Sequence, residues 1–209
     1  ALYIRVLPRS TGQSRFLNVY GNLYLMADIQ QLYTDIIEEL KQGKRPRVDI
    51  HDERHQALCQ HWREVLDNER ESTELLPVLC LLDHASRPHN GFQDYIAETL
   101  NSYPENPHDI IIHTLGVSQQ HIINYCQLHG DRLPGDFILA LKKLLREQED
   151  PEVLAWLLRL IESTGGQSLK FRQEIKERKP GLTAIFNTHK KASRDIIQNL
   201  EKQWAEYGF

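Results

Sequence analysis

Residues 150–161 read Asp150-Pro151-Glu152-Val153-Leu154-Ala155-Trp156-Leu157-Leu158-Arg159-Leu160-Ile161 and form the clearest helical unit of the chain. Asp150 suits a helix N-cap because its carboxylate accepts hydrogen bonds from free backbone N–H groups. Pro151 suits the first helical position, where an N–H would have no intrahelical partner. The residues that follow are apolar almost all round, so the helix needs neighbours on more than one side. The stretch therefore predicts a helix that is buried within a larger helical assembly.

Similar amphipathic segments follow one another from residue 27 to the C-terminus, separated by short gaps that contain Pro, Gly, Asn or Asp. In residues 29–40 the apolar side chains recur at helical spacing, and Gly43 marks the end of that segment. Ser118 is placed to cap a further helix, which Gly130 ends, and Pro134 opens the next one. This rhythm predicts a mainly α fold of stacked antiparallel helical hairpins, with about ten helices and short connections.

The opening Asp150-Pro151-Glu152-Val153 resembles a helix of the HEAT-repeat family, in which Asp-Pro-x-Val commonly begins a unit. The helical rhythm from residue 75 onward adds to this resemblance. It implies a HEAT/armadillo-like or irregular α-solenoid, an architecture that presents an elongated surface to a protein, peptide or nucleic-acid partner.

Residues 1–43 are expected to form an N-terminal segment and residues 49–209 the helical-repeat-like domain, joined by a basic, Pro-containing linker. Residues 2–7 alternate weakly between apolar and polar. Residues 16–20 and 23–26 flank Gly21-Asn22, a dipeptide suited to a tight hairpin turn. The sequence therefore allows a small N-terminal β element. The alternative is that Asn22 caps a helix already under way at Leu25.

Composition argues against a membrane-spanning protein. Mean hydropathy is -0.52, and the longest apolar run, residues 75–82, is interrupted by Pro77 and too short to cross a bilayer. We therefore expect no membrane insertion. Cys59, Cys80 and Cys126 lie far apart without a CxxC motif, which argues against both a disulfide framework and a thiolate zinc site. Buried, reduced thiols indicate a cytoplasmic protein.

Charge is distributed unevenly along the chain, whose net charge is -4. Residues 168–202 contain nine basic and four acidic residues, a net charge of +5, which leaves -9 for the rest. Such a basic end attracts anionic partners, either a protein surface or nucleic-acid phosphates. The plainer interpretation is a solvated helix face. The candidate partner-binding residues are Lys170, Arg172, Lys176, Arg178, Lys179, Lys190, Lys191 and Arg194.

Histidines raise the question of metal chemistry. His51 and His55 are four residues apart and would share one side of a helix, as two zinc ligands do. The segment resembles the HExxH motif of zinc proteases, but Asp52 replaces the catalytic Glu. Asp52 or Asp49 makes sense instead as a helix cap. We therefore expect no metal at this segment.

His108-Asp109, with His84 upstream and Asp131 or Asp136 downstream, loosely resembles the ligand set of HD-domain metal phosphohydrolases. That resemblance implies a divalent ion that activates water. Here the dipeptide follows Pro107 at a helix start, whereas the family usually places it after an apolar helical turn.

The sequence carries no nucleophile elbow, phosphate loop or dinucleotide-binding motif. We therefore expect a non-catalytic adaptor or scaffold that binds a protein partner through a helical surface and uses no cofactor. Two alternatives remain open, an HD-type metal-dependent phosphohydrolase and a nucleic-acid binder that uses the basic C-terminal helices. Aromatic residues are spread along the expected helices, and those that gather on one exposed face would mark the binding anchors: Tyr95, Tyr103, Tyr125, Trp156, Trp204 and Tyr207.

Overall fold

The structure is a computed structural model that describes residues 13–68, 70–102, 105–179 and 187–208, with side chains from residue 27 onward. The described residues are mainly helical. Their one extended element is an isolated bridge between Val48 and Ala85. Among them, no helix is both long enough and apolar enough to cross a membrane.

Ten α-helices and three short helical segments of other types make up this part of the chain. The α-helices are α1 (Gln13–Lys41), α2 (Asp52–Leu66), α3 (Leu75–Asp83), α4 (Gln93–Asn101), α5 (His108–Ser118), α6 (Tyr125–His129), α7 (Gly135–Glu147), α8 (Pro151–Glu162), α9 (Arg172–Glu177) and α10 (Thr188–Glu206). The other segments are the 3-10 helices η1 (Ser72–Glu74) and η3 (Gly165–Phe171) and the π-helical η2 (Gln119–Asn124).

Helix α8 begins as the sequence predicts. Asp150 Oδ1 accepts hydrogen bonds from the backbone N–H groups of Glu152 at 2.8 Å and Val153 at 3.2 Å, and Pro151 is the first helical residue. Seven of its twelve residues are buried, so α8 is enclosed on several sides. The mainly α fold class is confirmed.

The prediction of a β hairpin at residues 16–26 is wrong, because α1 already begins at Gln13 and runs without interruption to Lys41. A Gly inside a helix costs only about 1 kcal/mol relative to Ala, so Gly21-Asn22 does not outweigh the helical hydrogen bonds on both sides of it. Gly43, with φ of +73°, follows the end of the helix as expected. The expected alternation in residues 2–7 lies outside the described residues.

A second correction concerns Ser118, which does not cap a helix. Its hydroxyl donates to the Thr114 carbonyl oxygen at 2.6 Å, one turn back, and α5 continues through η2 into α6. A serine can bond the i−4 carbonyl in this way and remain inside a helix. The helix ends only at Gly130, whose φ of +71° places it in the left-handed region.

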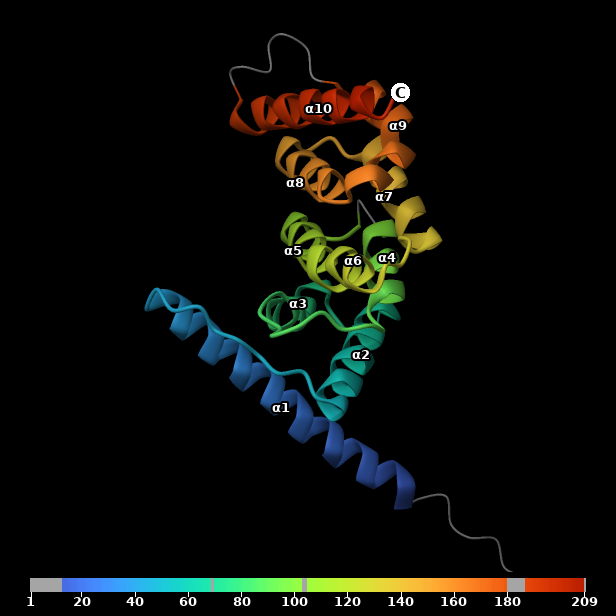
Figure 1. Ribbon diagram of the computed structural model, residues 1–209. Helices are drawn as coiled ribbons and strands as arrows, with labels where there is room; N and C mark the ends of the chain where they lie inside the picture. Colours follow the sequence, from blue (N-terminus) through green and yellow to red (C-terminus); the bar gives the residue numbers. More distant parts are fainter. Residues whose placement is uncertain (1–12, 69, 103–104, 180–186, 209) are drawn as a thin grey trace, which may run out of the picture.

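The helices lie in two rows that run side by side along the molecule (Figure 1). In one row α3 contacts α5, α5 contacts α8, and α8 contacts α10. In the other row α2 contacts α4, α4 contacts α7, and α7 contacts α9. Helix α1 lies at the N-terminal end, against α3 and α2 (Figure 1).

Contacts at their ends show that α3, α5, α8 and α10 run parallel to one another. His121, just beyond α5, donates from Nε2 to the carbonyl oxygen of Leu82 near the end of α3, at 2.9 Å. Gln119 accepts a hydrogen bond from Ser163, so the C-terminal ends of α5 and α8 also meet. Trp204 near the end of α10 donates from Nε1 to Ser168, which lies shortly after α8, at 2.9 Å.

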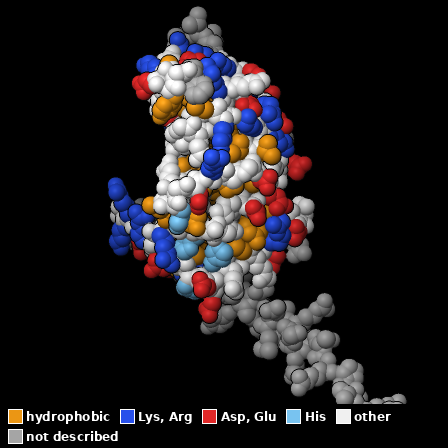
Figure 2. Space-filling view, turned by 45° about the vertical axis from the view of Figure 1, so that its right-hand side comes forward, with side chains coloured by type: hydrophobic (Ala, Val, Ile, Leu, Met, Phe, Trp, Pro, Cys, Tyr) orange, Lys and Arg blue, Asp and Glu red, His pale blue; other side chains and the backbone are white. Residues whose placement is uncertain are grey.

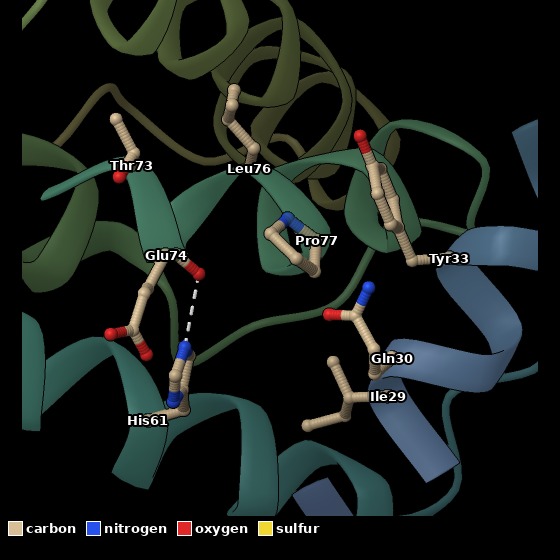
Figure 3. Close-up of a pocket in the computed structure, with 8 residues that line it drawn as sticks. All are labelled: Ile29, Gln30, Tyr33, His61, Thr73, Glu74, Leu76 and Pro77. Carbon is tan, nitrogen blue, oxygen red and sulfur yellow. Dashed lines mark hydrogen bonds between the residues drawn. The ribbon is translucent and has the colours of Figure 1, made fainter. Parts of the chain in front are cut away.

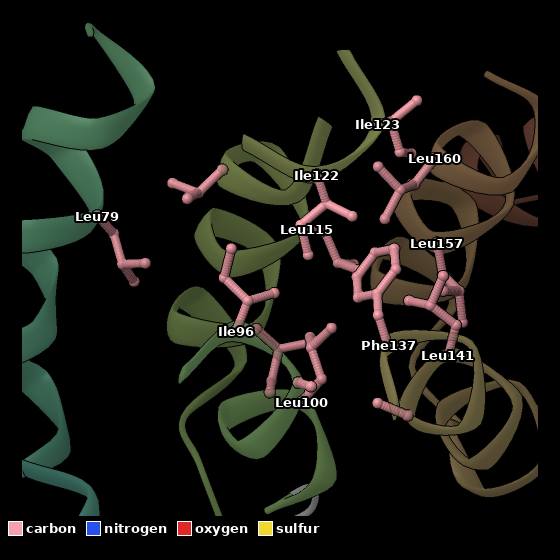
Figure 4. Close-up of a cluster of buried hydrophobic side chains, with 14 of the residues drawn as sticks. Leu79, Ile96, Leu100, Leu115, Ile122, Ile123, Phe137, Leu141, Leu157 and Leu160 are labelled. Atoms are coloured by element: carbon pink, nitrogen blue, oxygen red, sulfur yellow. The ribbon is translucent and has the colours of Figure 1, made fainter. Parts of the chain in front are cut away.

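A hydrophobic core lies between the two rows and reaches from Ile29 of α1 to Trp204 of α10. Figure 4 shows Leu115, Phe137 and Leu157 pointing toward one another from α5, α7 and α8. Because Ile29 and Ile36 of α1 belong to this core, α1 is packed onto the helices that follow it. The domain boundary at residues 44–48 stays a prediction.

Candidate interaction surface

The predicted basic residues of the C-terminal end fall into two groups. Lys170 to Lys179 lie on η3, on α9 and just after α9, whereas Lys190, Lys191 and Arg194 lie in the first turns of α10. Lys179 contacts Glu201 on α10 at 2.7 Å. Lys190 precedes Glu201 by eleven residues in the same helix, which places the two groups ~16 Å apart along α10.

The first of these two groups is also partly engaged. Lys179 is paired with Glu201, and Lys170 donates to Gln167 at 3.1 Å. Arg172 is only half-buried, but its Nε is enclosed without a hydrogen-bond partner among the described residues. A long anion would therefore meet two small basic groups, not one continuous basic patch.

The residues of the metal phosphohydrolase alternative lie at different ends of the helices. His84 follows α3 and donates from Nδ1 to the Cys80 carbonyl oxygen at 2.9 Å. The end of α3 faces the C-terminal end of α5, whereas His108 begins α5, ~15 Å away along the axis. Asp131 follows α6, and Asp136 lies in the first turn of α7. In the part of the chain that the structure describes, no three His, Cys, Asp or Glu side chains gather as metal ligands.

His51 and His55 each have another role. His51, not Asp49 or Asp52, caps α2, because its Nδ1 accepts from the Arg54 backbone N–H at 3.3 Å. His55 donates from Nε2 to the Asn90 carbonyl oxygen at 3.0 Å and packs against Phe92 with ring centroids 4.6 Å apart. Both imidazoles thus serve the fold of the α2–α4 region.

A buried histidine, His121, joins the loop before α4 to the end of α3. Its Nδ1 accepts from the His89 backbone N–H at 3.1 Å, and its Nε2 donates to Leu82. The two hydrogen bonds fix the neutral tautomer. Burial lowers the pKa of His121, and burial together with the neighbouring His121 lowers the pKa of His89. Both groups are therefore neutral near pH 7.

The three thiols are free, and none is set up as a nucleophile. Burial raises the pKa of both Cys59 and Cys80 to about 11. Burial raises the pKa of Cys126 as well. Because the thiolate is the reactive form, these groups are inert near neutral pH.

One side of the parallel row is left open, and it carries apolar side chains. Each of α3, α5 and α8 has a helix on both flanks, with α1 taking that place beside α3, and a helix of the other row behind it, so one face of each is left uncovered by the described helices. We call this uncovered side of α3, α5 and α8 the row face. Its half-buried or exposed members are Leu76, Pro77, Cys80, Ile112, His113, Gly116, Trp156 and Arg159.

Trp156 is the most prominent of these side chains. It is 39% exposed at the middle of α8, although the other apolar residues of that helix are buried. The Arg159 guanidinium lies over its indole ring, 5.3 Å from the ring centroid. An indole that is open to solvent, backed by a packed helix and stacked on an arginine has the composition of a protein-interface anchor.

The other aromatic residues considered as anchors lie elsewhere. Trp204 is buried, and Tyr95 and Tyr125 are half-buried. Tyr207 is exposed beyond the end of α10, away from the row face, and Tyr103 lies outside the described residues. Spacing along the chain does not distinguish Trp156 from Trp204, because both occupy apolar helical stripes. The distinction depends on which faces the neighbouring helices cover.

No known protein family, curated protein or solved structure matches this chain.

Proposed function

We propose that this chain is a non-catalytic scaffold or adaptor that binds a protein partner through the row face, and that its helices form an α-solenoid of the HEAT/armadillo kind. The parallel register of α3, α5, α8 and α10, with the other row behind them, supports this architecture. In helical repeats of this kind, corresponding helices of successive units line one extended surface. The free, protonated thiols agree with a cytoplasmic setting.

The exposed indole of Trp156 is the observation that carries the proposal. Trp156 lies on α8, which stands between α5 and α10 in the row, and Ile112 of α5 is on the same open side. Burying a tryptophan of this kind commonly dominates the free energy of an interface. The row face also lacks the convergent acid, base and nucleophile that a reaction centre needs.

The test is quantitative affinity capture from a lysate of the native cell, with the full chain and two variants as bait. Trp156→Ala should reduce recovery of a specific partner by about tenfold or more, since an anchor of this type contributes ~2 kcal/mol. Leu139→Ala is the matched control, because Leu139 is 62% exposed on α7 in the other row. Its partner recovery should equal that of the wild type.

Identical recovery by the wild type and both variants would contradict the proposal. Loss of the partner after nuclease treatment would point instead to the nucleic-acid alternative. Charge reversal at Lys190 and Lys191 then identifies whether the basic start of α10 carries that contact.

A further inference from the structure

The N-terminal end of the row face is hollowed where α1 meets α3. A cavity of about 290 Å³ lies there. Ile29, Tyr33, Leu76 and Pro77 supply its apolar wall, and polar groups of Gln30, Thr73, Glu74 and His61 lie at its margin (Figure 3). Leu76 and Pro77 also belong to the row face, so the cavity adjoins that surface beside α1.

Five cations lie at the end of α1, on the linker that follows it, and just after α3. They are Lys41, Lys44, Arg45, Arg47 and Arg87, which we call the cation cluster. Lysine and arginine side chains gather at the lower left of the molecule in Figure 2, beside a group of histidines. All five members are exposed, and none takes part in an ion pair with any described residue.

Backbone hydrogen bonds hold the two cationic segments together. The Val48 N–H donates to the His84 carbonyl oxygen, and the Ser86 N–H donates to the Val48 carbonyl oxygen, both at 2.9 Å. Arg47 precedes Val48 and Arg87 follows Ser86, so the two arginines lie on neighbouring, hydrogen-bonded segments of the chain. Residues 41–49 and 83–87 contain the five cations and two acids, Asp49 and Asp83, which gives a net charge of +3.

The cavity and the cation cluster are separated by a defined distance. Leu76 lines the cavity near the start of α3, whereas the linker after α1 pairs with His84 just after the end of α3. His84 follows Leu76 by eight residues, a span of ~12 Å along α3. An extended peptide covers that span with about four residues, and a helical peptide with about eight.

We infer that this end of the molecule binds a segment of the partner protein that carries one bulky apolar side chain and, ~12 Å further along, a group of acidic residues. The inference rests on the proposed function and specifies the chemistry of the partner. The apolar side chain enters the cavity between Tyr33 and Leu76. The carboxylates meet Arg45, Arg47 and Arg87, whose guanidinium groups suit bidentate pairing with carboxylates.

Charge and shape favour this occupant over two others. Residues 1–12 of the chain itself carry Arg5 and Arg9 and no acid, and residues 180–186 carry no charge, so neither complements the cation cluster. A nucleic acid complements the cations but has no bulky aliphatic group for the apolar cavity. Its length would also extend over a chain whose net charge outside residues 168–202 is -9.

The experiment is selection of displayed random peptides of about twelve residues against the immobilised full chain, a length that exceeds the required span in either conformation. Enriched peptides should combine a large apolar residue with at least two acids. Synthesised with a fluorescent label, they are titrated by anisotropy. The Kd should rise by about tenfold or more in Leu76→Asp and in the Arg45→Glu, Arg47→Glu double variant.

Matched controls separate local from general effects. The Lys190→Glu, Lys191→Glu double variant makes the same change of charge on α10 and should leave the Kd within about twofold of the wild type. Tyr33→Ala should weaken binding in parallel with Leu76→Asp. A far-ultraviolet circular dichroism melt of each variant verifies that it is folded.

Several outcomes would overturn the inference. They are the absence of enriched peptides, enrichment of neutral or basic peptides, and an unchanged Kd in the Leu76 and Arg45/Arg47 variants. A doubled mass in light scattering that Leu76→Asp abolishes would assign the site to a second copy. Tight binding of a single-stranded RNA oligonucleotide that requires Arg45 and Arg47 would assign it to nucleic acid.

Failure here is distinguishable from failure of the proposed function. If the captured partner depends on Trp156 while no acidic peptide binds at the cavity, the inference alone is wrong. If no partner depends on Trp156 either, the proposed function fails with it.

Discussion

At the scale of single residues, His108 links the beginnings of two helices. Its Nδ1 lies 3.4 Å from Asp109 Oδ1 on α5, and its Nε2 lies 3.3 Å from Asp150 Oδ1, the cap of α8. Glu152 Oε2 is 3.8 Å away. Burial alone would lower the pKa of His108, but the hydrogen bonds to Asp109 and Asp150 and the charge of the nearby carboxylates outweigh it, so the pKa is raised.

This raised pKa predicts a pH-dependent effect of His108→Gln. The folded protein holds the proton more tightly than the unfolded chain does, so the stabilisation is complete below the unfolded pKa and is lost as pH rises through the folded value. Chemical denaturation should show the variant destabilised at about pH 5.5 and nearly equal to the wild type at about pH 8. The side chain is 38% exposed, so solvent screening keeps the effect below about 1 kcal/mol.

His113→Gln is the matched control, because His113 is exposed on the same helix and has no ion pair among the described residues. Equal destabilisation of the two variants at low pH, or a larger effect of His108→Gln at high pH, would contradict the assignment. The cap Asp150 is predictable from the sequence because its partners are the next two or three residues. The contact of His108 with Asp150 spans 42 positions, and no local pattern reports it.

At the scale of elements, α10 is joined to the segment after α8 by a buried hydrogen bond. Trp204 Nε1 donates to Ser168 Oγ at 2.9 Å, and both side chains are buried. Ser168→Ala would leave the indole N–H enclosed without an acceptor, which should lower the free energy of unfolding by about 1–3 kcal/mol. Urea denaturation followed by tryptophan fluorescence measures the change.

Ser193→Ala provides the comparison, because Ser193 is buried on the same helix but its hydroxyl has no hydrogen-bond partner in the part of the chain that the structure describes. Removing that hydroxyl should be neutral or slightly stabilising, since no acceptor or donor is orphaned. If the two serine variants lose the same stability, the cost reflects lost volume and not the hydrogen bond.

The sequence predicts that a helix is present where an apolar stripe is long, but it does not predict where that helix begins and ends. The stripe from Ile29 to Leu40 predicted part of α1, and Gly43 predicted its end. Gly21-Asn22 does not form the hairpin turn that the dipeptide suggests, because a dipeptide signal is local, whereas the helix is stabilised by hydrogen bonds on both sides. Ser118 bonds back to Thr114 instead of capping a helix, and the choice between the two depends on the residues packed around it, which a local pattern does not report.

At the scale of the whole molecule, the candidate surface depends on register between helices, which the sequence does not contain. Ile112 and Trp156 belong to one face only because α5 and α8 are parallel and meet at both ends. The basic residues of the C-terminal end illustrate the converse. Close in sequence, Lys179 and Lys190 are separated along α10, because Lys179 meets Glu201 in the second half of that helix.

The same arrangement predicts how stability is distributed. Each helix contacts mainly the next ones in its row and across it, so a defect at one end should reach its neighbours and fade beyond them. Ile36 of α1 and Leu200 of α10 are buried at opposite ends of the core. Truncating either to Ala leaves a cavity that costs about 2–5 kcal/mol.

Amide hydrogen exchange distinguishes local from global opening. Ile36→Ala should speed exchange in α1 and α3 by about tenfold or more while α8 and α10 keep wild-type protection, since each 1.4 kcal/mol is a factor of about ten. Leu200→Ala should do the reverse, and each variant thereby serves as the control for the other. Uniform acceleration of every helix by either variant would mean that the protein unfolds as one cooperative unit. In that case contacts to the next helix would not limit how far a defect spreads.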